Sequence, residues 1–149
     1  MKILVINGPN LDMLGYREPA VYGDKKYSDL CSYIRDKAYE LHVDVEILQS
    51  NHEGAIVEMI HDAFFKGYDG LIINAGAYTH YSYAIRDALA ILTCPIAEVH
   101  LSDVMNREDF RKISVIEPVC TVRCFGKGFE SYKDALDFMA GKGSTAHEE

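Results

Sequence analysis

The stretch KILVINGPNLDMLGYREPAVYG, residues 2–23, opens the chain with a short apolar run followed by a long loop. A strand-to-helix connection in an α/β domain normally takes about 2–6 residues, and Gly8–Gly23 is far longer. Loops of this length in compact domains are typical of binding or active-site segments. Asn10, Arg17 and Tyr22 lie in it, and a cation near a phenol favours the ionised phenol.

Beyond this first unit, short apolar runs alternate with amphipathic stretches, which is typical of βα units around a parallel sheet. The expected strands are Lys2–Asn7, Val43–Asn51, Gly70–Ala75, Pro95–His100 and Cys120–Phe125. Several of them are apolar throughout, as strands are when helices cover both faces of a sheet. The sequence therefore predicts an α/β fold with a five-stranded parallel sheet.

The segments between these strands carry apolar residues at helical spacing. One helix is marked by Leu30, Ile34, Ala38 and Leu41, and a second by Ile56, Ile60, Ala63 and Phe64. Further helices are expected over Tyr83–Leu92 and Tyr132–Ala140, with a short one near Glu108–Lys112 for which Ser102 or Asp103 would be a cap.

The 149 residues predict a single domain, residues 1–141, and a small polar tail, residues 142–149, that we expect to be mobile. With no apolar run long enough to span a membrane and no signal core, the expected location is the cytoplasm. Four cysteines without a CxxC pair are expected to be reduced core thiols. A net charge of −8 argues against nucleic acid and anionic membranes as partners, whereas an anionic small substrate stays open.

Polar residues follow several expected strands, where ligands bind in a doubly wound sheet. Asn10 follows the first strand, Asn74 and His80 follow the third, and Glu98–Ser102 ends the fourth. Because the carboxyl ends of parallel strands share one edge of the sheet, we expect these residues to converge on one crevice.

Glu98 and His100 lie two residues apart on an expected strand, so their side chains point to the same face. The carboxylate can then orient the imidazole and hold a proton on it, which makes a general acid. The alternative is an ordinary buried ion pair, but the position at the end of a strand favours the site.

The other candidates keep two interpretations at this point. His80 can bind a ligand or begin a helix, and Asn74 can hold a substrate oxygen or satisfy loop backbone groups. Arg111 lies in a charged stretch that also fits a solvated helix face, as Arg107 does. Tyr22 is one of ten tyrosines and is distinguished only by its place in the long loop.

Competing motifs are absent from the sequence. It contains no Walker A sequence, no GxGxxG dinucleotide fingerprint, no GxSxG nucleophile elbow and no HExxH spacing for a catalytic metal. The histidine spacing therefore gives little support to a catalytic metal.

Several motifs together resemble a known family, the type II 3-dehydroquinate dehydratases. They are INGPNLDMLGYREPAVYG (residues 6–23), QSNHEG (49–54), NAGAYTHYSYAIRDAL (74–89), EVHLSDVMNREDFR (98–111) and GKGFESYKDAL (126–136). The resemblance implies a flavodoxin-like fold and cofactor-free anti elimination of water from 3-dehydroquinate through an enolate, giving 3-dehydroshikimate. It fits the shikimate pathway of aromatic amino-acid biosynthesis or, alternatively, quinate breakdown.

The resemblance also implies the roles of the catalytic residues. Tyr22 would be the base, activated by Arg17, which would also stabilise the transition state. Asn10 would help to stabilise the enolate, and His100, oriented by Glu98, would protonate the departing hydroxyl.

The same resemblance implies substrate binding by Asn74, His80, Arg111 and the backbone amides of Leu101 and Ser102. Asp87 would reach the site of a neighbouring subunit, in a homododecamer built from trimers. Asp12, Tyr81, Tyr83, Asp103 and Glu130-Ser131 depart from the common family pattern without touching a catalytic position. A flavodoxin-like binding module and an inactive homologue are the alternative classes.

Overall fold

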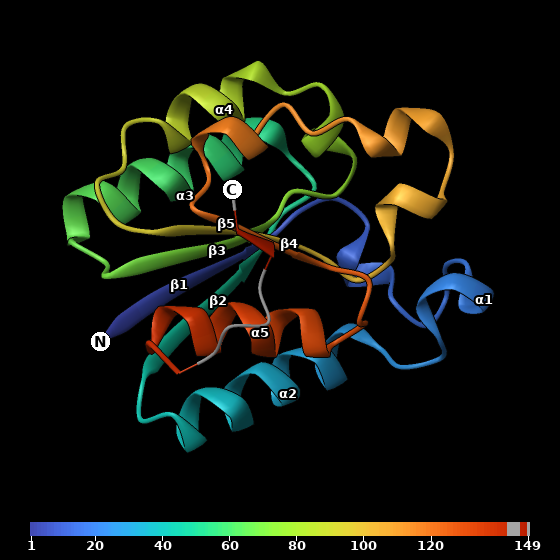
Figure 1. The fold of residues 1–149 in the computed structure, drawn as a ribbon, viewed down its shortest axis with the longest axis horizontal. Helices are drawn as coiled ribbons and strands as arrows, with labels where there is room; N and C mark the ends of the chain where they lie inside the picture. The colour runs from blue at the N-terminus through green and yellow to red at the C-terminus, as the bar shows by residue number, and fades with distance from the viewer. Residues whose placement is uncertain (143–146, 149) are drawn as a thin grey trace.

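The computed structural model describes residues 1–142 and 147–148. A twisted sheet runs through its centre, with strands in the order β2-β1-β3-β4-β5-β6. The strands are β1 (Lys2–Asn7), β2 (Asp44–Gln49), β3 (Gly70–Asn74), β4 (Ile96–His100), β5 (Val122–Phe125) and β6 (His147–Glu148). The first five are parallel, so the expected flavodoxin-like sheet of five parallel strands is confirmed (Figure 1).

Helices cover both faces of the sheet. They are α1 (Pro19–Tyr22), α2 (Tyr27–Glu40), α3 (Glu53–Lys66), α4 (Tyr83–Leu89) and α5 (Glu130–Met139). Helices α2 and α5 lie on one face and α3 and α4 on the other, while α1 stands apart beyond the carboxyl ends of the strands (Figure 1). The longer helices follow the predicted apolar spacing; α4, expected to reach Leu92, ends at Leu89.

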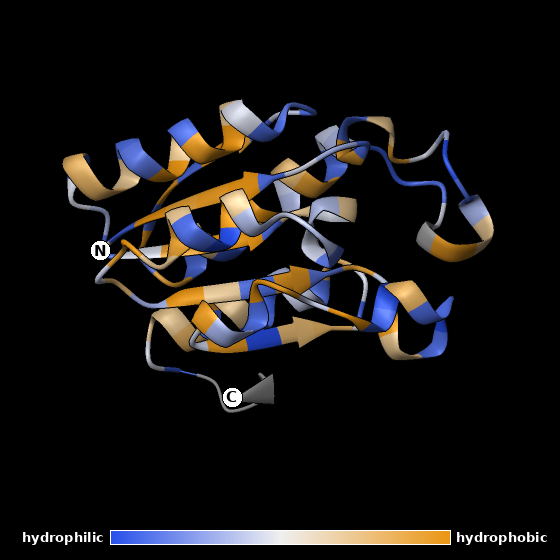
Figure 2. Ribbon diagram, turned by 90° about the horizontal axis from the view of Figure 1, so that it is seen from above, coloured by the Kyte–Doolittle hydropathy of each residue, from blue (hydrophilic) through white to orange (hydrophobic). Residues whose placement is uncertain are grey.

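Alternate residues of each strand build two separate apolar layers. In β1, Ile3 and Val5 pack into the layer beneath α2 and α5, whereas Leu4 and Ile6 pack into the layer beneath α3 and α4. All four are almost completely buried, as a parallel strand covered on both faces must be. Figure 2 shows these apolar strands at the centre, with more polar surfaces on the helices around them.

The connections contain short 3-10 turns where the sequence suggested loops or one short helix. These are η1 (Leu11–Met13), η2 (Gly76–His80), η3 (Val104–Asn106), η4 (Asp109–Lys112) and η5 (Glu117–Val119). The helix expected near Glu108–Lys112 is therefore the 3-10 turn η4. Asp103 does act as a cap, but of η3, where its carboxylate accepts a hydrogen bond from the Met105 amide.

The carboxyl-terminal segment reaches back to the sheet. Residues 147–148 form β6, antiparallel to β5, and this strand was not expected from the sequence. The rest of the predicted mobile tail, apart from Lys142, lies outside the described residues. All four cysteines are free thiols, three of them buried and Cys94 half-buried, in line with the sequence interpretation. Within the described part of the chain, no helix is long and apolar enough to cross a membrane.

Two loops at the carboxyl edge of the sheet pass in close contact. A Cβ at Gly8, just after β1, would lie 2.7 Å from the Ala75 carbonyl oxygen, just after β3. Gly76 has a φ of 58°, and a Cβ there would lie 3.0 Å from the Pro9 carbonyl oxygen. The glycines therefore let the loops that carry Asn10 and Asn74 lie side by side.

Candidate active site

A pocket of about 80 Å³ lies at the carboxyl edge of the sheet, beyond β1, β3 and β4. Ligands bind at this edge in doubly wound α/β folds. The predicted site residues that line it are Asn10, Arg17, Asn74, His80, His100, Leu101, Ser102 and Arg111. The expected convergence on one crevice therefore occurs, over segments that span about a hundred positions of sequence.

Asn10 is held in an unusual backbone conformation at the start of η1. Its φ is 70°, which non-glycine residues rarely adopt. The Asn10 amide donates a 2.9 Å hydrogen bond to Asn51 Oδ1, and Gln49 bonds both Asn51 Oδ1 and the Gly8 carbonyl oxygen at 3.1 Å. These side chains from the end of β2 fix the loop, so that Asn10 faces the pocket.

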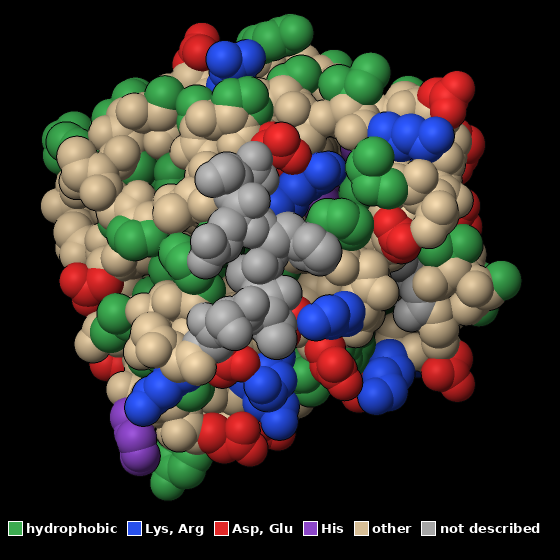
Figure 3. Space-filling view, viewed as in Figure 1, with side chains coloured by type: hydrophobic (Ala, Val, Ile, Leu, Met, Phe, Trp, Pro, Cys, Tyr) green, Lys and Arg blue, Asp and Glu red, His purple; other side chains and the backbone are tan. Residues whose placement is uncertain are grey.

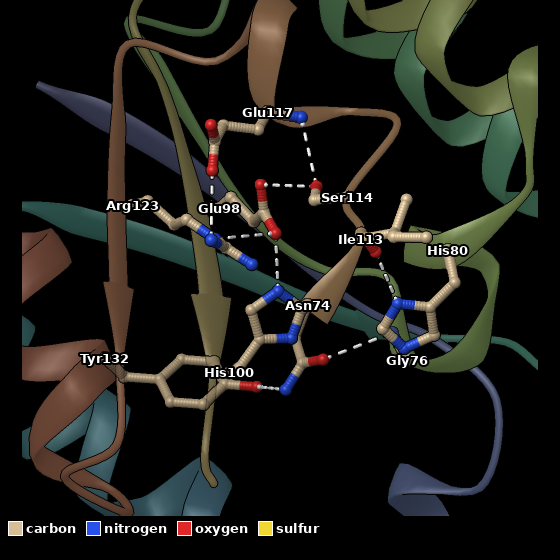
Figure 4. Close-up of polar contacts among 10 residues, drawn as sticks. All are labelled: Asn74, Gly76, His80, Glu98, His100, Ile113, Ser114, Glu117, Arg123 and Tyr132. Carbon is tan, nitrogen blue, oxygen red and sulfur yellow. Dashed lines mark hydrogen bonds and ion pairs between the residues drawn. The ribbon is translucent and has the colours of Figure 1, made fainter. Parts of the chain in front are cut away.

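Asn74 is oriented by a buried chain of polar groups on the α2 and α5 side of the sheet. Its Nδ2 donates to the Tyr132 hydroxyl at 3.0 Å, and that hydroxyl donates to Asn7 Oδ1 at 2.6 Å. Asn74 Oδ1 accepts a 3.2 Å bond from the Gly76 amide. Figure 4 shows the Asn74 amide held between Tyr132 and Gly76. The side-chain amide of Asn74 therefore has one defined orientation at the pocket wall.

His100 and Glu98 form a close pair on the opposite face of the sheet. His100 Nε2 lies 2.5 Å from Glu98 Oε2, and both residues are buried. An ionised carboxylate only accepts hydrogen bonds, so the proton on Nε2 is committed to Glu98. The other ring nitrogen, Nδ1, is then the atom that can pass a proton to a ligand.

Glu98 is kept ionised although no part of it is exposed to solvent. Burial alone raises the pKa of this carboxyl group, but several partners outweigh burial and bring the pKa below its ordinary value of 4.5. These are the hydrogen bond and charge of His100, the charge of Arg123 and the Ser114 hydroxyl, which donates at 3.0 Å. Glu98 is therefore a buried, negatively charged partner for His100.

His80 and Arg111 form another wall of the pocket. His80 Nδ1 lies 2.7 Å from the Ile113 carbonyl oxygen, and Arg111 Nε donates to Glu108 at 3.2 Å. Burial lowers the pKa of His80, and the nearby charges of His100 and Arg111 lower it further, against the raising effect of the Ile113 carbonyl. The alternative in which His80 begins a helix is wrong, because α4 starts at Tyr83 and the Ser82 hydroxyl caps it by accepting the bond from the Ile85 amide.

The long loop reaches across the sheet edge and contacts the segment after β4. Arg17 Nη2 lies 3.4 Å from Glu18 Oε2, and the same carboxylate oxygen lies 3.3 Å from Arg107 Nη2. Arg107 also reaches Ser102 Oγ at 3.5 Å. Glu18 thus links the loop to the wall of the pocket, and Arg17 lines the pocket from the loop. The backbone of Tyr22 ends α1 in this loop, and its side chain lies outside the described residues.

Asp87 is the predicted site residue that the fold places elsewhere. It is exposed on α4 and does not line this pocket. Glu98 also lies behind the pocket, in contact with it through His100. Sequence inspection missed Tyr132 and Arg123, whose partners Asn74 and Glu98 are 58 and 25 positions away, and read Arg107 only as a solvated residue. No local signal marks such pairs.

A larger groove of about 1100 Å³ adjoins the pocket between the long loop, α2 and α5. It shares Leu101 and Ser102 with the pocket, but many of its other lining side chains are charged surface residues such as Lys25, Lys133 and Asp137. His100, which is paired with Glu98, and the buried Asn74 amide both line the smaller pocket, which is therefore the candidate active site. Among residues 1–142 and 147–148 no group of three or more His, Cys, Asp or Glu side chains is arranged to hold a metal ion.

Comparison with known proteins agrees with this architecture. Residues 1–140 match the family model of class II dehydroquinase. A 3-dehydroquinate dehydratase of Lachnospira eligens is 52% identical over 138 residues, covering 92% of this chain and 94% of the relative. The crystal structure of a type II dehydroquinase from Butyrivibrio crossotus superimposes with a TM-score of 0.92 at 53% identity and covers 93% of this chain and 97% of that chain. A type II dehydroquinase from Propionibacterium acnes has a TM-score of 0.91 at 40% identity, covering 94% of this chain and 96% of that chain.

The doubly wound sheet with its pocket at the carboxyl edge defines an α/β protein of the flavodoxin-like class. Within that class, the chain belongs to the class II dehydroquinase family. The resemblance drawn from its motifs is thereby confirmed.

Proposed function

We infer that this chain is a hydro-lyase that converts 3-dehydroquinate to 3-dehydroshikimate. The observation that carries the assignment is the buried Glu98–His100 pair, which opens into a pocket that Arg17 and Asn10 line from the long loop. Membership of the family and the near-complete overlap with its relatives support the same reaction. On this chemistry we propose the following roles.

Tyr22 is the base that removes a proton from the carbon next to the substrate ketone. A phenol with an ordinary pKa near 10 needs a cation to ionise at neutral pH, and Arg17 on the same loop supplies that charge. The Arg17 guanidinium also faces the pocket, where it can stabilise negative charge as it develops. Asn10, with its backbone fixed by Asn51, stabilises the enolate, either directly or through a bound water.

His100 is the acid that completes the elimination. Hydroxide is a poor leaving group, so it must be protonated as its bond to carbon breaks. Glu98 holds the proton on Nε2 and stabilises the imidazolium, so Nδ1 delivers the second proton to the hydroxyl. Water leaves, and the electron pair of the enolate forms the new carbon–carbon double bond.

Substrate binding falls to the remaining walls of the pocket. Asn74, His80 and Arg111 contact the ring and its hydroxyl groups, and the backbone amides of Leu101 and Ser102 receive the carboxylate. The cationic side chains of Arg17 and Arg111 in the pocket suit an anion, although the chain as a whole carries a net charge of −8. In the view of Figure 3, basic and acidic side chains are interspersed, and that face has no basic patch of the kind nucleic acid requires.

We also propose a homo-oligomer, built from trimers into a dodecamer. Large apolar side chains are exposed on the segments that carry His80, Asp87 and Arg111, which is typical of a subunit interface; they are Tyr81, Tyr83, Phe110 and Ile113. Asp87 lies on α4, as Tyr83 does. In a trimer Asp87 would reach the pocket of a neighbouring subunit. The free thiols of all four cysteines fit the reducing cytoplasm as the location of the assembly.

Mixing two weakly active variants tests the shared site. In this proposal each site combines His100 of one subunit with Asp87 of its neighbour. The Asp87→Asn subunit keeps His100 and the His100→Ala subunit keeps Asp87, so a mixed oligomer would contain some intact sites. We expect each variant alone to be weakly active and the mixture to regain activity after subunit exchange. A mixture no more active than its parts would place Asp87 outside the reaction.

The reaction itself is tested by following ultraviolet absorbance of 3-dehydroquinate with purified, chelator-treated protein. The conjugated product absorbs where the substrate does not, so a rapid rise is expected. Tyr22→Phe should bind substrate and nearly abolish the rise, while His100→Ala should remove most activity. A flat trace with folded wild-type protein would favour the flavodoxin-like binding module or an inactive homologue. Of the two pathways that use this dehydration, we propose aromatic amino-acid biosynthesis rather than quinate breakdown.

A further inference from the structure

Arg123 on β5 lies directly beside the proposed acid pair, although nothing in the sequence pattern marks it. Glu98 and Arg123 are register partners on neighbouring parallel strands, so their side chains share one face of the sheet. Arg123 Nε lies 3.3 Å from Glu98 Oε2, the same oxygen that His100 Nε2 contacts at 2.5 Å. Figure 4 shows the guanidinium on one side of this carboxylate and the imidazole on the other.

The Arg123 side chain is held in this position by the segment between η4 and β5. Arg123 Nη1 lies 3.0 Å from Glu117 Oε2. Ser114 Oγ donates to Glu98 Oε1 at 3.0 Å and accepts a 3.1 Å bond from the Glu117 amide. Glu98, Ser114, Glu117 and Arg123 therefore form a closed ring of contacts next to the His100 imidazole.

The charges in this ring determine how strongly an imidazolium is held. Glu98 is fully buried and Arg123 nearly so, and in such surroundings charges interact more strongly than in water. Glu117 contributes a second, more exposed negative charge. On the pocket side, the titratable and cationic groups that line the pocket with His100 are His80, Arg111 and Arg17.

The Arg123 guanidinium makes few polar contacts other than those to Glu98 and Glu117. Its Nη2 is buried with no acceptor within the described ranges of the chain, and its guanidinium carbon lies 5.2 Å from the centre of the Phe125 ring. Its charge is therefore directed mainly at Glu98 and Glu117. A buried arginine with one unsatisfied nitrogen lowers the stability of the fold. We therefore look for a role of Arg123 other than packing.

We propose that Arg123 is a positioning residue that shares the negative charge of Glu98 with His100, and so sets how readily the His100 imidazolium releases its proton to the departing hydroxyl. The inference rests on the proposed role of His100 as the acid. Without Arg123, the whole carboxylate charge would act on the imidazolium and hold its proton more tightly. A general acid works best when its proton affinity is matched to the working pH.

The test compares three variants by their pH profiles. Arg123→Gln removes the charge and keeps a hydrogen-bonding side chain, whereas Arg123→Lys keeps the charge. Arg35→Gln, on the exposed surface of α2, is the matched control for the change in net charge. For each we would measure kcat against pH and titrate the His100 imidazole by NMR, with His100→Gln to assign the signal among the six histidines.

In Arg123→Gln we expect the alkaline limb of the kcat profile and the NMR titration to move up by about 1 pH unit. The kcat near pH 7 should fall about threefold, because a more tightly held proton is transferred more slowly. Arg123→Lys should stay near the wild-type profile, and Arg35→Gln should match it. A merely structural Arg123 would lower the thermal stability of the Gln variant and leave both titrations unmoved, which would overturn the proposal.

Glu117→Gln gives a second measurement if Arg123→Gln does not fold. Removing this half-exposed carboxylate leaves the charge of Arg123 free to act on Glu98 alone, so the His100 titration should move the opposite way, toward lower pH. No movement, or movement to higher pH, would contradict the proposal. The NMR titration tests Arg123 without turnover, so an inactive wild-type protein would count against the proposed function and not against this inference.

Discussion

Tyr132 donates a hydrogen bond of 2.6 Å from its fully buried hydroxyl to Asn7 Oδ1, 125 residues earlier in the chain. The same hydroxyl accepts from Asn74 Nδ2. Because one hydroxyl has a single proton, donation to Asn7 leaves only its lone pairs for Asn74, and this sets the orientation of the Asn74 amide. A residue of α5 thus determines which atom of a pocket side chain faces the ligand.

Tyr132→Phe should therefore weaken both folding and binding. The change leaves Asn7 Oδ1 and Asn74 Nδ2 buried without this partner, which should lower the free energy of unfolding by about 1–3 kcal/mol. We expect a raised KM with a smaller change in kcat, measured by urea unfolding and steady-state kinetics. Tyr39→Phe, 83% exposed on α2, is the control. Equal KM values in the two variants would show that Asn74 does not need Tyr132.

Arg17→Ala tests the cation of the long loop. If Arg17 activates the base and stabilises the transition state, kcat should fall by at least about 100-fold with little change in KM. Arg35→Ala, on the surface of α2, should leave both constants unchanged. Steady-state and single-turnover rates check this, and an effect confined to KM would instead make Arg17 a substrate-binding residue.

Glu18→Gln tests the contact that links the loop to the pocket wall. Glu18 Oε2 lies 3.3 Å from Arg107 Nη2, and the Glu18 side chain is 40% exposed, so the loss should be at most about 1 kcal/mol. We expect KM to rise up to about fivefold and protease cleavage within residues 8–23 to become faster. Glu40→Gln, which breaks a comparable pair with Lys37 on α2, should change neither. Unaltered cleavage in Glu18→Gln would mean that this pair does not hold the loop.

Glu98 should contribute to the pH dependence of stability. Its pKa in the folded protein lies below the ordinary 4.5, because the hydrogen bonds and charges of His100, Arg123 and Ser114 outweigh burial. A carboxyl group with a depressed folded pKa stabilises the fold above its unfolded pKa, and this contribution is lost as pH falls through the folded pKa. Wild-type protein should therefore lose stability as pH drops below about 4.5.

Glu98→Gln should remove that part of the dependence, giving a shallower decline in the free energy of unfolding between about pH 5 and pH 3. Urea unfolding monitored by circular dichroism measures the slope. Glu40→Gln, an exposed site, should keep the wild-type slope. Parallel slopes in all three proteins would mean that the pKa of Glu98 is the same in the folded and the unfolded state.

Much of the fold was predictable because its signals are local. The apolar run Lys2–Asn7 matches β1 at both ends, and β3, β4 and β5 differ from their predicted ranges by one or two residues. The 3-10 turn at Asp109–Lys112 was harder, since charged residues at helical spacing do not separate a single 3-10 turn from an α-helix. Strand β6 was not predicted because its sequence is polar and carries no local strand signal. It forms only because the fold brings it beside β5.

The sequence by itself determined the Glu98–His100 pair, because two residues apart on a strand must share a face, and it identified the long loop by length alone. Only the tertiary structure decided which residues complete the site. Arg123 reaches Glu98 through the register of β5 on β4, and Tyr132 reaches Asn74 from α5 across the sheet edge. Such contacts depend on strand order, register and helix placement, which arise from packing of the whole chain and not from the periodicity of any one segment.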